Sequence, residues 1–453
     1  MMSTVQQDAG HFPSMTRKVI AACFVGTTVE WYDFFLYGTA SALVFPRIFF
    51  PQFSPLAGTA AAFGAFAAGF IARPIGGIVF GHFGDRIGRK TMLIYSLVGM
   101  GLATVAMGFL PTYAQVGVWA PVLLVACRLV QGFAVGGEWG GAVLMSVEHS
   151  PEGKRGLAGS WTQAGSPAGL VIATLAYAGF SLLPADAFIS WGWRGPFILS
   201  AVLVIFGLFI RLKLLESPVF QEVIDSGTKS RLPLVDAIKK HPLNILLAIG
   251  CCLAPFTNFY LFAVFVLTYG TVSLGMDHGV VLTIVAIAAA LEVITIPLAA
   301  SLSDRIGRRK VFLTGAVLFG AFAYPFFLIN EAAASPWVLG ISSIVGLTLI
   351  HPWMYGPMAA LFAEMFSPAV RYSGASLGYQ IGGILGGGFA PLILTELLAT
   401  DLGAAVAIPP YMIIVSVLTF VAVFFGTQPG RKYTTSGLKN PANALNQNVS
   451  IRK

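Results

Sequence analysis

The sequence predicts an all-α membrane protein with twelve transmembrane helices, arranged as two pseudo-symmetric six-helix bundles with both termini in the cytoplasm. Three observations support this prediction. Apolar residues make up 56% of the 453 residues and charged residues only 10%, whereas a soluble domain carries roughly a quarter charged residues. The apolar residues come in blocks of about twenty or more, which is long enough to cross a bilayer as a helix. Motifs of the first half also return in the second half.

The apolar blocks fall into two sets of six around a polar central stretch. The expected spans are 18–41, 57–80, 91–111, 118–142, 156–180 and 196–215, then 243–269, 280–302, 311–330, 337–360, 373–398 and 405–427. The predicted organisation is an N-terminal cytoplasmic tail (1–17), an N-terminal bundle (18–215), a central cytoplasmic loop (216–242), a C-terminal bundle (243–427) and a C-terminal tail (428–453). That last tail is polar and lacks heptads, so we expect it to be disordered.

Positive charge is distributed unevenly between the two sides of the predicted membrane. Of 27 Lys and Arg residues, only Arg47 and Arg194 fall in the odd-numbered loops, and Arg73 and Arg128 lie within spans. The other 23 gather in the tails, the even-numbered loops and the adjoining span ends (Lys18, Arg211 and Lys213), and the positive-inside rule places this side in the cytoplasm. A nucleic-acid binder would need these charges on one accessible face. The net charge of +8 therefore indicates membrane topology, and we expect no nucleic-acid partner.

Several function classes lack their characteristic motifs. The cysteines Cys23, Cys127, Cys251 and Cys252 show no metal-ligand spacing, so we interpret them as small packing residues and expect no metal site. No GxxxxGK[ST] loop occurs, which disfavours direct ATP hydrolysis. The first fifteen residues are polar and do not form a signal peptide. No nucleophile–base pair stands out, so we do not expect an enzyme.

Two motifs recur between the halves at nearly one offset. The segment Gly84 to Lys90 after the second span returns as Ser303 to Arg309 after the eighth span, and its aspartates are 219 residues apart. An acid and an arginine also bracket the loop after span 4 and the loop after span 10, and their offset is 216 residues: Glu148 with Arg155, and Glu364 with Arg371. This arrangement indicates halves related by an axis along the membrane normal, with a substrate site between them near the midplane.

The motifs resemble those of a known family. Asp85-Arg86-x-Gly88-Arg89-Lys90 and Arg128-x-x-Gln131-Gly132 are similar to motifs of the major facilitator superfamily. Further segments resemble its metabolite:proton symporter family, whose members carry shikimate, α-ketoglutarate, citrate or proline/betaine: Glu30 to Phe34, Arg73 to Gly77, Gln131 to Glu138 and Gly192 to Phe197. The similarity runs from about residue 17 to 427, and Arg128 with the glycines around Trp139 is closest to the shikimate type. One departure is Ala300, which stands where the first copy of the motif has Gly81.

The resemblance implies a proton-coupled secondary active symporter of the bacterial inner membrane, importing a small organic acid by alternating access. Its partners would be the carboxylate, the proton and the lipid bilayer, with the proton gradient in place of a cofactor and a monomer as the working unit. Alternatives are a carrier of zwitterionic solutes of the proline/betaine type or an exporter of related acids. A membrane-embedded enzyme and a channel are disfavoured, the channel because the halves and their cytoplasmic motifs are duplicated.

Two acids and an arginine are expected at similar depth inside the membrane. Glu30 and Asp33 share one helix face of the first span, and an ionisable side chain there costs about 2.5–3.5 kcal/mol unless it faces a partner or water. We predict that these two acids bind the coupling proton and that Arg128 binds the substrate carboxylate. Once Arg128 is paired with the substrate, it no longer balances the charge of the two acids, and their affinity for a proton rises. The alternative is that these residues and Arg73 form a buried structural salt-bridge network.

Other buried polar residues are weaker candidates. Arg73 and Glu292 each lie twelve residues before the motif aspartate of their half, and either one would also serve to neutralise a neighbour. His351 precedes Pro352 in the tenth span, where a broken helix often lines a transport site, although a buried histidine is commonly only hydrogen-bonded. The candidate substrate-binding residues, each of which would equally serve packing, are Tyr37, Trp139, Gln163, Asn258, Tyr260, His351, Trp353, Tyr379 and Gln380.

The repeated cytoplasmic motif is the candidate gate. By resemblance, its acids and arginines would lock the halves together on the cytoplasmic side by pairing with helix ends and charges of the other half. The residues concerned are Asp85, Arg86, Arg89, Lys90, Glu148, Arg155, Asp304, Arg305, Arg308, Glu364 and Arg371. The alternative is that these positive loops only fix the topology. Glycines at every fourth position of spans 4 and 11, such as Gly132 and Gly136, would allow helices to approach closely and slide.

Overall fold

The computed structural model describes residues 14–87, 89–136, 138–148, 150–151, 153–213, 238–239, 241–366 and 371–427. Over these residues the chain is helical and contains no strand. Both predicted tails, apart from residues 14–17, and nearly all of the predicted loop 216–242 lie outside the described residues. The same holds for the side chains of six predicted gate residues: Asp85, Arg86, Arg89, Lys90, Glu148 and Arg371.

The six predicted spans of the first half are all present as helices. They are α1 (Ser14–Leu43), α3 (Pro55–Ile87), α4 (Arg89–Gly108), α6 (Trp119–Val135) with α7 (Trp139–Glu148), α8 (Arg155–Ser181) and α10 (Gly195–Lys213). Short helices lie in the connections: α2 (Phe45–Ile48), α5 (Tyr113–Val116), α9 (Ala185–Ser190) and the 3-10 turn η1 (Gly192–Arg194). The fourth span, expected as one helix over 118–142, is divided beside Gly136, because glycine weakens a helix interior.

The second half also forms its six spans, but with interruptions that the sequence did not predict. The spans are α13 (Pro242–Tyr260) continued by α14 (Val266–Thr268), α15 (His278–Ile306), α16 (Arg308–Ala333), α17 (Pro336–Ile344) with α18 (His351–Met365), α19 (Arg371–Gly383) with α20 (Ala390–Leu398), and α21 (Ala404–Gly426). Four π-helical segments lie within them: η2 (Leu261–Phe265), η3 (Tyr269–Ser273), η4 (Val345–Ile350) and η5 (Ile384–Gly388). Such segments are often found at functional sites.

Length and hydropathy support the predicted membrane crossings. Eleven helical stretches of the described chain are long and apolar enough to span a bilayer, and a shorter apolar helix, Ile94–Gly108, lies in the position of the third span. The prediction of twelve spans is therefore confirmed. With an even number of crossings, α1 begins and α21 ends on the same side, which we call the terminal side. The positive-inside rule predicts that this side is cytoplasmic.

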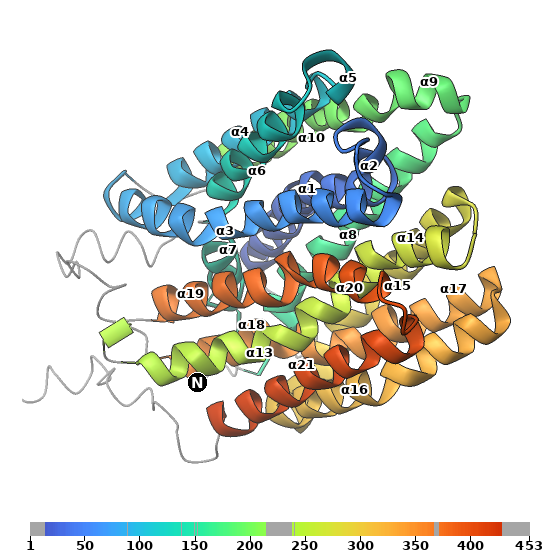
Figure 1. Ribbon diagram of the computed structural model, residues 1–453. Coiled ribbons are helices and arrows are strands. Elements are labelled where there is room, and N and C mark those ends of the chain that lie inside the picture. Colours follow the sequence, from blue (N-terminus) through green and yellow to red (C-terminus); the bar gives the residue numbers. More distant parts are fainter. Residues whose placement is uncertain are drawn as a thin grey trace, which may run out of the picture.

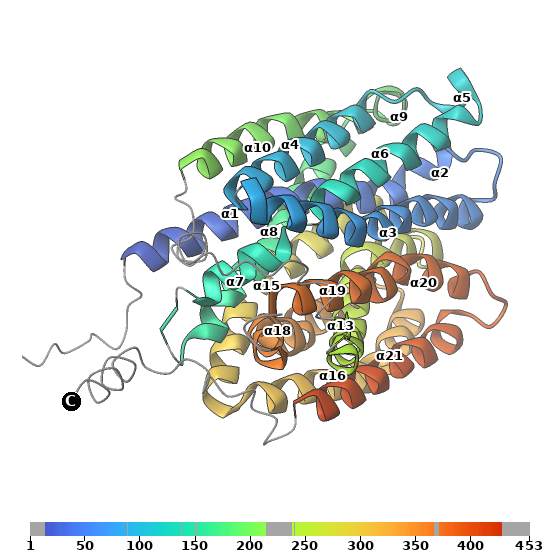
Figure 2. The same cartoon turned by 90° about the vertical axis from the view of Figure 1, so that its left-hand side faces the viewer.

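The helices form two bundles side by side. Figures 1 and 2 show the helices of the first half, blue to green, in one layer and those of the second half, yellow-green to red, in the other. Along the boundary α8 packs against α15, α3 packs against η5 and α20, and α7 packs against α19. Phe35 of α1 also contacts Phe259 of α13, with ring centroids 5.2 Å apart. The polar residues at this boundary are therefore enclosed between two apolar bundles.

The motif aspartate of the second half belongs to a helix and not to the loop that we expected. Asp304 lies in the last turn of α15, which ends at Ile306 because Gly307 takes a φ of 101°. This left-handed conformation suits glycine, which has no Cβ to clash with the following carbonyl. The longer helix brings the carboxylate of Asp304 to the boundary with the first bundle.

Candidate functional site

The middle of α1 carries two buried acids. Glu30 is 5% exposed and Asp33 is fully buried. The Asp33 carboxylate accepts a hydrogen bond from the Ser200 hydroxyl of α10, while its second oxygen, Oδ2, has no hydrogen-bond partner among the described residues. Asp33 therefore faces the interior of the first bundle, where one carboxylate oxygen keeps free hydrogen-bonding capacity.

Arg128 of α6 is fully buried, but it does not pair with these acids. Its guanidinium lies 4.0 Å from the ring centroid of Tyr37 and 4.6 Å from that of Phe34, and Nη2 donates to the carbonyl oxygen of Phe66 at 3.4 Å. In the described part of the chain Arg128 forms no ion pair, so the expected direct contact with Glu30 or Asp33 is absent. Aromatic faces attract a guanidinium, and they replace the carboxylates here.

Gln131 connects Arg128 to Asp33. Its side-chain oxygen accepts a hydrogen bond from Arg128 Nη1, and its Nε2 donates to the Thr104 hydroxyl at 2.7 Å and to the Asp33 carbonyl oxygen at 3.5 Å. We did not include Gln131 among the predicted site residues, although it stands three positions after Arg128 on the same helix face. Gln131 therefore links Arg128 to the main chain of Asp33, while the Asp33 carboxylate bonds Ser200 instead.

Arg73 of α3 lies between the first bundle and a tyrosine of the second. Its guanidinium is 4.1 Å from the ring centroid of Phe34 and 4.5 Å from that of Phe70. Tyr260 of α13 packs against Phe70 with ring centroids 5.6 Å apart, and it lies within electrostatic range of Arg73, Arg128 and Glu30. The Tyr260 hydroxyl is buried and has no hydrogen-bond partner among the described residues. It is thus a free donor and acceptor close to both arginines.

The second bundle contributes its own buried polar groups. Glu292 of α15 and His351 of α18 contact each other through Oε1 and Nδ1, and both are fully buried. Asn258 of α13 is also buried, and neither of its side-chain polar atoms has a partner in the described part of the chain. Glu292 and Arg73 occupy matching positions in the two halves of the sequence, but Glu292 contacts a histidine whereas Arg73 lies against aromatic rings.

Four further candidate residues close the boundary toward the terminal side. Trp139 of α7 stacks on Tyr379 of α19 with ring centroids 3.6 Å apart, and its indole N–H donates to Gln163 Oε1 at 2.9 Å. Gln380 Nε2 donates to the Gly136 carbonyl oxygen at 2.8 Å across the same boundary. Trp353, in contrast, packs on Gly315 of α16 and does not belong to this group.

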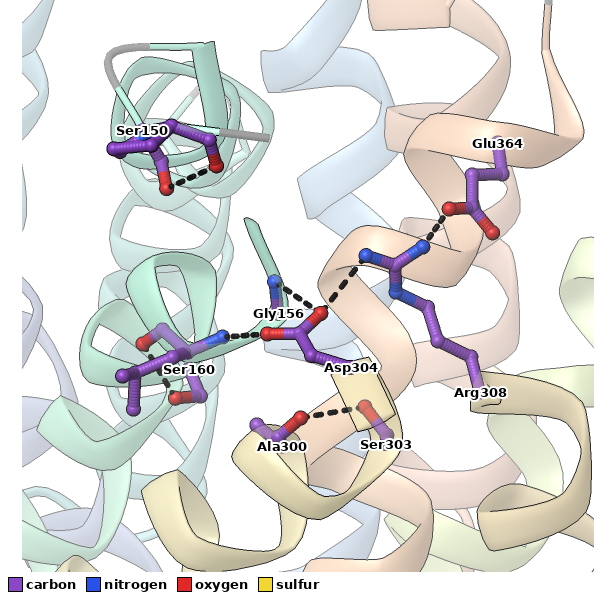
Figure 3. A network of polar contacts seen from close by, with 10 residues as sticks. Ser150, Gly156, Ser160, Ala300, Ser303, Asp304, Arg308 and Glu364 are labelled. Carbon is purple, nitrogen blue, oxygen red and sulfur yellow. Dashed lines mark hydrogen bonds and ion pairs between the residues drawn. The ribbon is translucent and has the colours of Figure 1, made fainter. Parts of the chain in front are cut away.

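Of the predicted gate residues of the second half, Asp304 bridges the two bundles on the terminal side. Asp304 accepts hydrogen bonds from the backbone N–H groups of Gly156 at 3.1 Å and Leu157 at 3.0 Å, in the first turn of α8 (Figure 3). Arg308 bonds Asp304 at 3.0 Å and forms an ion pair with Glu364 of α18. A helix N-terminus carries partial positive charge and free N–H groups, so it is a favourable partner for a carboxylate. Arg305 is exposed.

A cavity of about 740 Å³ lies beside this contact. Its lining carries several basic side chains from both bundles: Arg155, Arg308, Arg309 and Lys310. The gate contact is therefore at the edge of a positively charged recess on the terminal side.

Many of the buried polar atoms without partners lie on helices at the bundle boundary, although others lie on outer helices, such as Asn330 Oδ1 of α16 and Ser416 Oγ of α21. In the described part of the chain they include Asp33 Oδ2, Tyr37 Oη, Arg73 Nε, Arg128 Nε, the Asn258 amide, Tyr260 Oη, Glu292 Oε2 and His351 Nε2. Native proteins pair nearly all buried polar groups with protein or ordered water. This set therefore indicates a site suited to a polar ligand, with cations supplied by the first bundle and neutral hydrogen-bonding groups by the second.

Two family models match the chain, one in each half. The model described as Sugar (and other) transporter matches residues 18–232, and the model described as Major Facilitator Superfamily matches residues 271–452.

Curated relatives match nearly the whole chain. The shikimate transporter of Escherichia coli (strain K12) is 43% identical over 85% of this chain and 88% of its own length. The inner membrane metabolite transport protein YhjE of the same organism is 41% identical over 93% of this chain and 96% of its own length. The proline/betaine transporter of Escherichia coli (strain K12) is 35% identical over 85% of this chain and 78% of its own length.

Solved structures share the fold. A crystal structure of a D-xylose-proton symporter has a TM-score of 0.68 and covers 91% of this chain and 97% of its own. A partially occluded inward open conformation of the xylose transporter XylE from Escherichia coli has a TM-score of 0.69 with the same coverage. Both are 18% identical in sequence, so this likeness concerns the fold alone.

Proposed function

This chain belongs to the major facilitator superfamily and is a transporter of the bacterial inner membrane, and we propose that it is a proton symporter that imports a small carboxylic acid. The observation that carries the proposal is the connection from Asp33 through Gln131 to Arg128. Because Gln131 bonds both Arg128 and the Asp33 backbone carbonyl, a residue able to bind a carboxylate and an acid able to bind a proton are neighbours of one amide side chain. Neither a cofactor nor a metal enters this mechanism.

The balance of buried charge supports coupling between proton and anion. With Glu30 and Asp33 ionised, they offset Arg73 and Arg128, so these four side chains sum to zero; Glu138, a further buried acid of the first bundle, accepts a hydrogen bond from Ser96. A substrate carboxylate would add one negative charge to a site enclosed by apolar helices, where unbalanced charge costs several kcal/mol. A proton bound at Asp33 or Glu30 removes that excess. Anion and proton therefore each favour the binding of the other.

Gln131 gives this coupling a route. A carboxylate that binds Arg128 with two parallel hydrogen bonds competes with the Gln131 oxygen for the same guanidinium. The released amide oxygen is then an acceptor for the O–H of a protonated Asp33. In the reverse step Asp33 returns its proton to water, and Gln131 again binds Arg128.

The second bundle supplies neutral groups for the rest of the substrate. The Tyr260 hydroxyl and the Asn258 amide have free hydrogen-bonding capacity, which suits the hydroxyl or carbonyl groups of a hydroxylated acid. The relative named as a shikimate transporter supports a substrate of that class. Shikimate is therefore the first solute to test.

A zwitterionic solute is the second candidate, because relatives named as proline/betaine transporters are also found. A quaternary ammonium group needs uncovered aromatic faces. Phe34, Phe66 and Phe70 already lie under the guanidinium groups of Arg73 and Arg128. This arrangement favours the carboxylate, whether the transporter imports or exports it.

The decisive experiment uses purified protein in proteoliposomes with labelled shikimate and an imposed pH gradient. We expect accumulation when the outside is acidic, together with alkalinisation of the outside medium. Arg128→Ala should abolish uptake, and Asp33→Asn should lose gradient-driven accumulation but keep exchange of labelled for unlabelled substrate. Arg47→Lys and Asp277→Asn, at exposed positions, are the matched controls.

Three outcomes would contradict the proposal. One is equal uptake by wild type with and without the gradient, and another is full gradient-driven uptake by Asp33→Asn. Gradient-driven uptake of labelled proline or betaine, with none of shikimate or other carboxylates, would favour the zwitterion carrier. A carrier that moves the acid only outward would retain the site but reverse the direction.

A further inference from the structure

Glu292 and His351 meet in the interior of the second bundle. Glu292 lies in the middle of α15, and His351 is the first residue of α18. The contact joins Oε1 of the carboxyl group to Nδ1 of the imidazole, and both side chains are fully buried. The mechanism proposed above uses neither residue.

No arginine or lysine balances this pair in the described part of the chain. His351 contacts Glu292, the ring of Tyr355 at 4.9 Å between centroids and the ring of Phe259 at 5.3 Å, and the backbone of Pro255 in α13 also faces its imidazole. A buried carboxylate without a cation costs several kcal/mol. One proton removes this cost, either as a carboxylic acid donating to Nδ1 or as an imidazolium donating to Oε1. Each of these two forms carries one proton more than a carboxylate beside a neutral imidazole.

The other titratable groups near the pair supply no positive charge. Tyr355 lies within electrostatic range of Glu292 and also of Glu30 in α1. The Tyr379 hydroxyl of α19 lies 3.4 Å from that of Tyr355, and Tyr260 of α13 is within electrostatic range of Tyr355. Arg73 lies within electrostatic range of Tyr260 and Tyr379, but no arginine or lysine of the described residues acts on Glu292 or His351 directly. The proton is therefore the counter-charge left for Glu292.

The backbone beside His351 allows the contact to open. The π-helical segment η4 ends at Ile350 directly before His351, and Pro352 follows it. The Thr348 hydroxyl of η4 donates to the Ala288 carbonyl oxygen of α15 at 2.9 Å, so the segment is attached to the helix that carries Glu292. A π segment holds one extra residue per turn, and a shift of that residue turns His351 relative to α15.

We propose that Glu292 and His351 together bind a second proton, which exchanges with water when the contact between α15 and α18 opens during transport. The site lies in the opposite bundle from Asp33, so it operates whether or not Asp33 carries the coupling proton. Glu292 Oε2 and His351 Nε2, which have no hydrogen-bond partner among the described residues, are the atoms through which the proton enters and leaves.

The test measures protonation directly and needs no substrate. Infrared difference spectra of purified wild type in lipid, recorded between about pH 5 and pH 9, should contain a carboxyl band and an imidazole band that change together. Glu292→Gln and His351→Asn should each remove both bands, because the two groups bind one proton as a unit. Glu331→Gln and His278→Asn, the same substitutions at exposed positions, should leave both bands in place.

The number of protons taken up per protein molecule over the same pH range is a second, independent measurement. The wild type should take up one proton per molecule more than either variant. If one variant does not fold, the other gives the same comparison. A wild type whose spectrum and proton uptake match those of a folded Glu292→Gln or His351→Asn protein would overturn the proposal, because the pair would then be a fixed structural contact.

Discussion

The carboxylate of Asp304 lies 3.1 Å from the backbone nitrogen of Gly156, and this hydrogen bond joins the end of α15 to the beginning of α8 in the opposite bundle. A second bond to the Leu157 N–H, at 3.0 Å, completes the contact. Arg308 bonds the same carboxylate from its own bundle. Opening the boundary on the terminal side therefore requires Asp304 to leave the N-terminus of α8.

Asp304→Asn should shift the protein toward states that are open on the terminal side. A hydrogen bond to a charged group contributes about 1.5–3 kcal/mol, against about 0.5–1.5 kcal/mol for a neutral one. The loss of charge should therefore reduce the ratio of closed to open molecules by about tenfold. The distance between spin labels attached at positions 154 and 310, measured by double electron–electron resonance, should be longer in the variant than in the wild type.

Glu364→Gln is the control for this prediction. It removes an ion pair with Arg308 inside one bundle, and the Glu364 side chain is 58% exposed. Exposed ion pairs contribute only about 0–1 kcal/mol, so the label distances should stay close to those of the wild type. Equal shifts in both variants would show that Asp304 acts only through Arg308 and not as a bridge between bundles.

Close packing of α3 on α6 predicts a sharp difference between two glycines. A Cβ at Gly132 would overlap the carbonyl oxygen of Gly69, whereas a Cβ at Gly141 of α7 would meet nothing within 4 Å. Gly132→Ala should destabilise the protein by about 1–3 kcal/mol through overpacking. Gly141→Ala should be neutral or stabilising, because alanine favours a helix by about 1 kcal/mol over glycine. Thermal unfolding in detergent measures both, and similar midpoints would contradict the packing.

The role given to Gln131 can be tested by Gln131→Leu. The variant keeps Asp33 and Arg128 but removes the side chain that bonds Arg128 and the Asp33 backbone carbonyl. We expect gradient-driven accumulation of substrate to fall at least tenfold while exchange across the membrane continues, because binding and proton coupling become separate. Gln115→Leu, at an exposed position, should leave both assays unchanged. Loss of exchange and accumulation to the same extent would mean that Gln131 serves binding alone.

The twelve spans were predictable because each is a long apolar block, and the bilayer requires little else of a helix. The π-helical segments were not predictable in this way. The segment η4 has the composition of an ordinary apolar helix. The three glycines of η5 weaken a helix but do not specify a π turn, so packing against neighbouring helices selects the wider turn. The sequence likewise indicated a loop at Asp304, because a charged motif ends an apolar block whether or not the helix continues.

The site was predictable as a set of buried polar residues but not as a set of contacts. Periodicity places Glu30 and Asp33 on one face of α1, yet it does not say which helix lies opposite. Asp33 meets Ser200, 167 positions away in the sequence, and Arg128 meets aromatic rings where we expected acids. The spacing of Arg128 and Gln131 was the one local signal for the link between them.

A comparison of two tyrosine variants distinguishes a hydroxyl that contacts the substrate from a hydroxyl that only stabilises the fold. The Tyr32 hydroxyl donates to the Pro196 carbonyl oxygen at 2.7 Å, whereas the Tyr260 hydroxyl has no partner among the described residues. Tyr32→Phe should therefore lower stability by about 1 kcal/mol without changing KM. Tyr260→Phe should leave the unfolding midpoint unchanged and raise KM about 2- to 10-fold, the value of one hydrogen bond to the substrate.

Both tyrosine variants keep the aromatic ring and its packing, so each tests the hydroxyl alone. Tyr260 is the sharper case because its hydroxyl stands near Arg73 and Arg128, where a bound carboxylate would lie. A loss of stability without a change in KM would show that this hydroxyl bonds water or protein in the empty site. An increase in KM with unchanged stability places the substrate between the arginines of the first bundle and α13 of the second, and alternating access then requires both bundles to move around it.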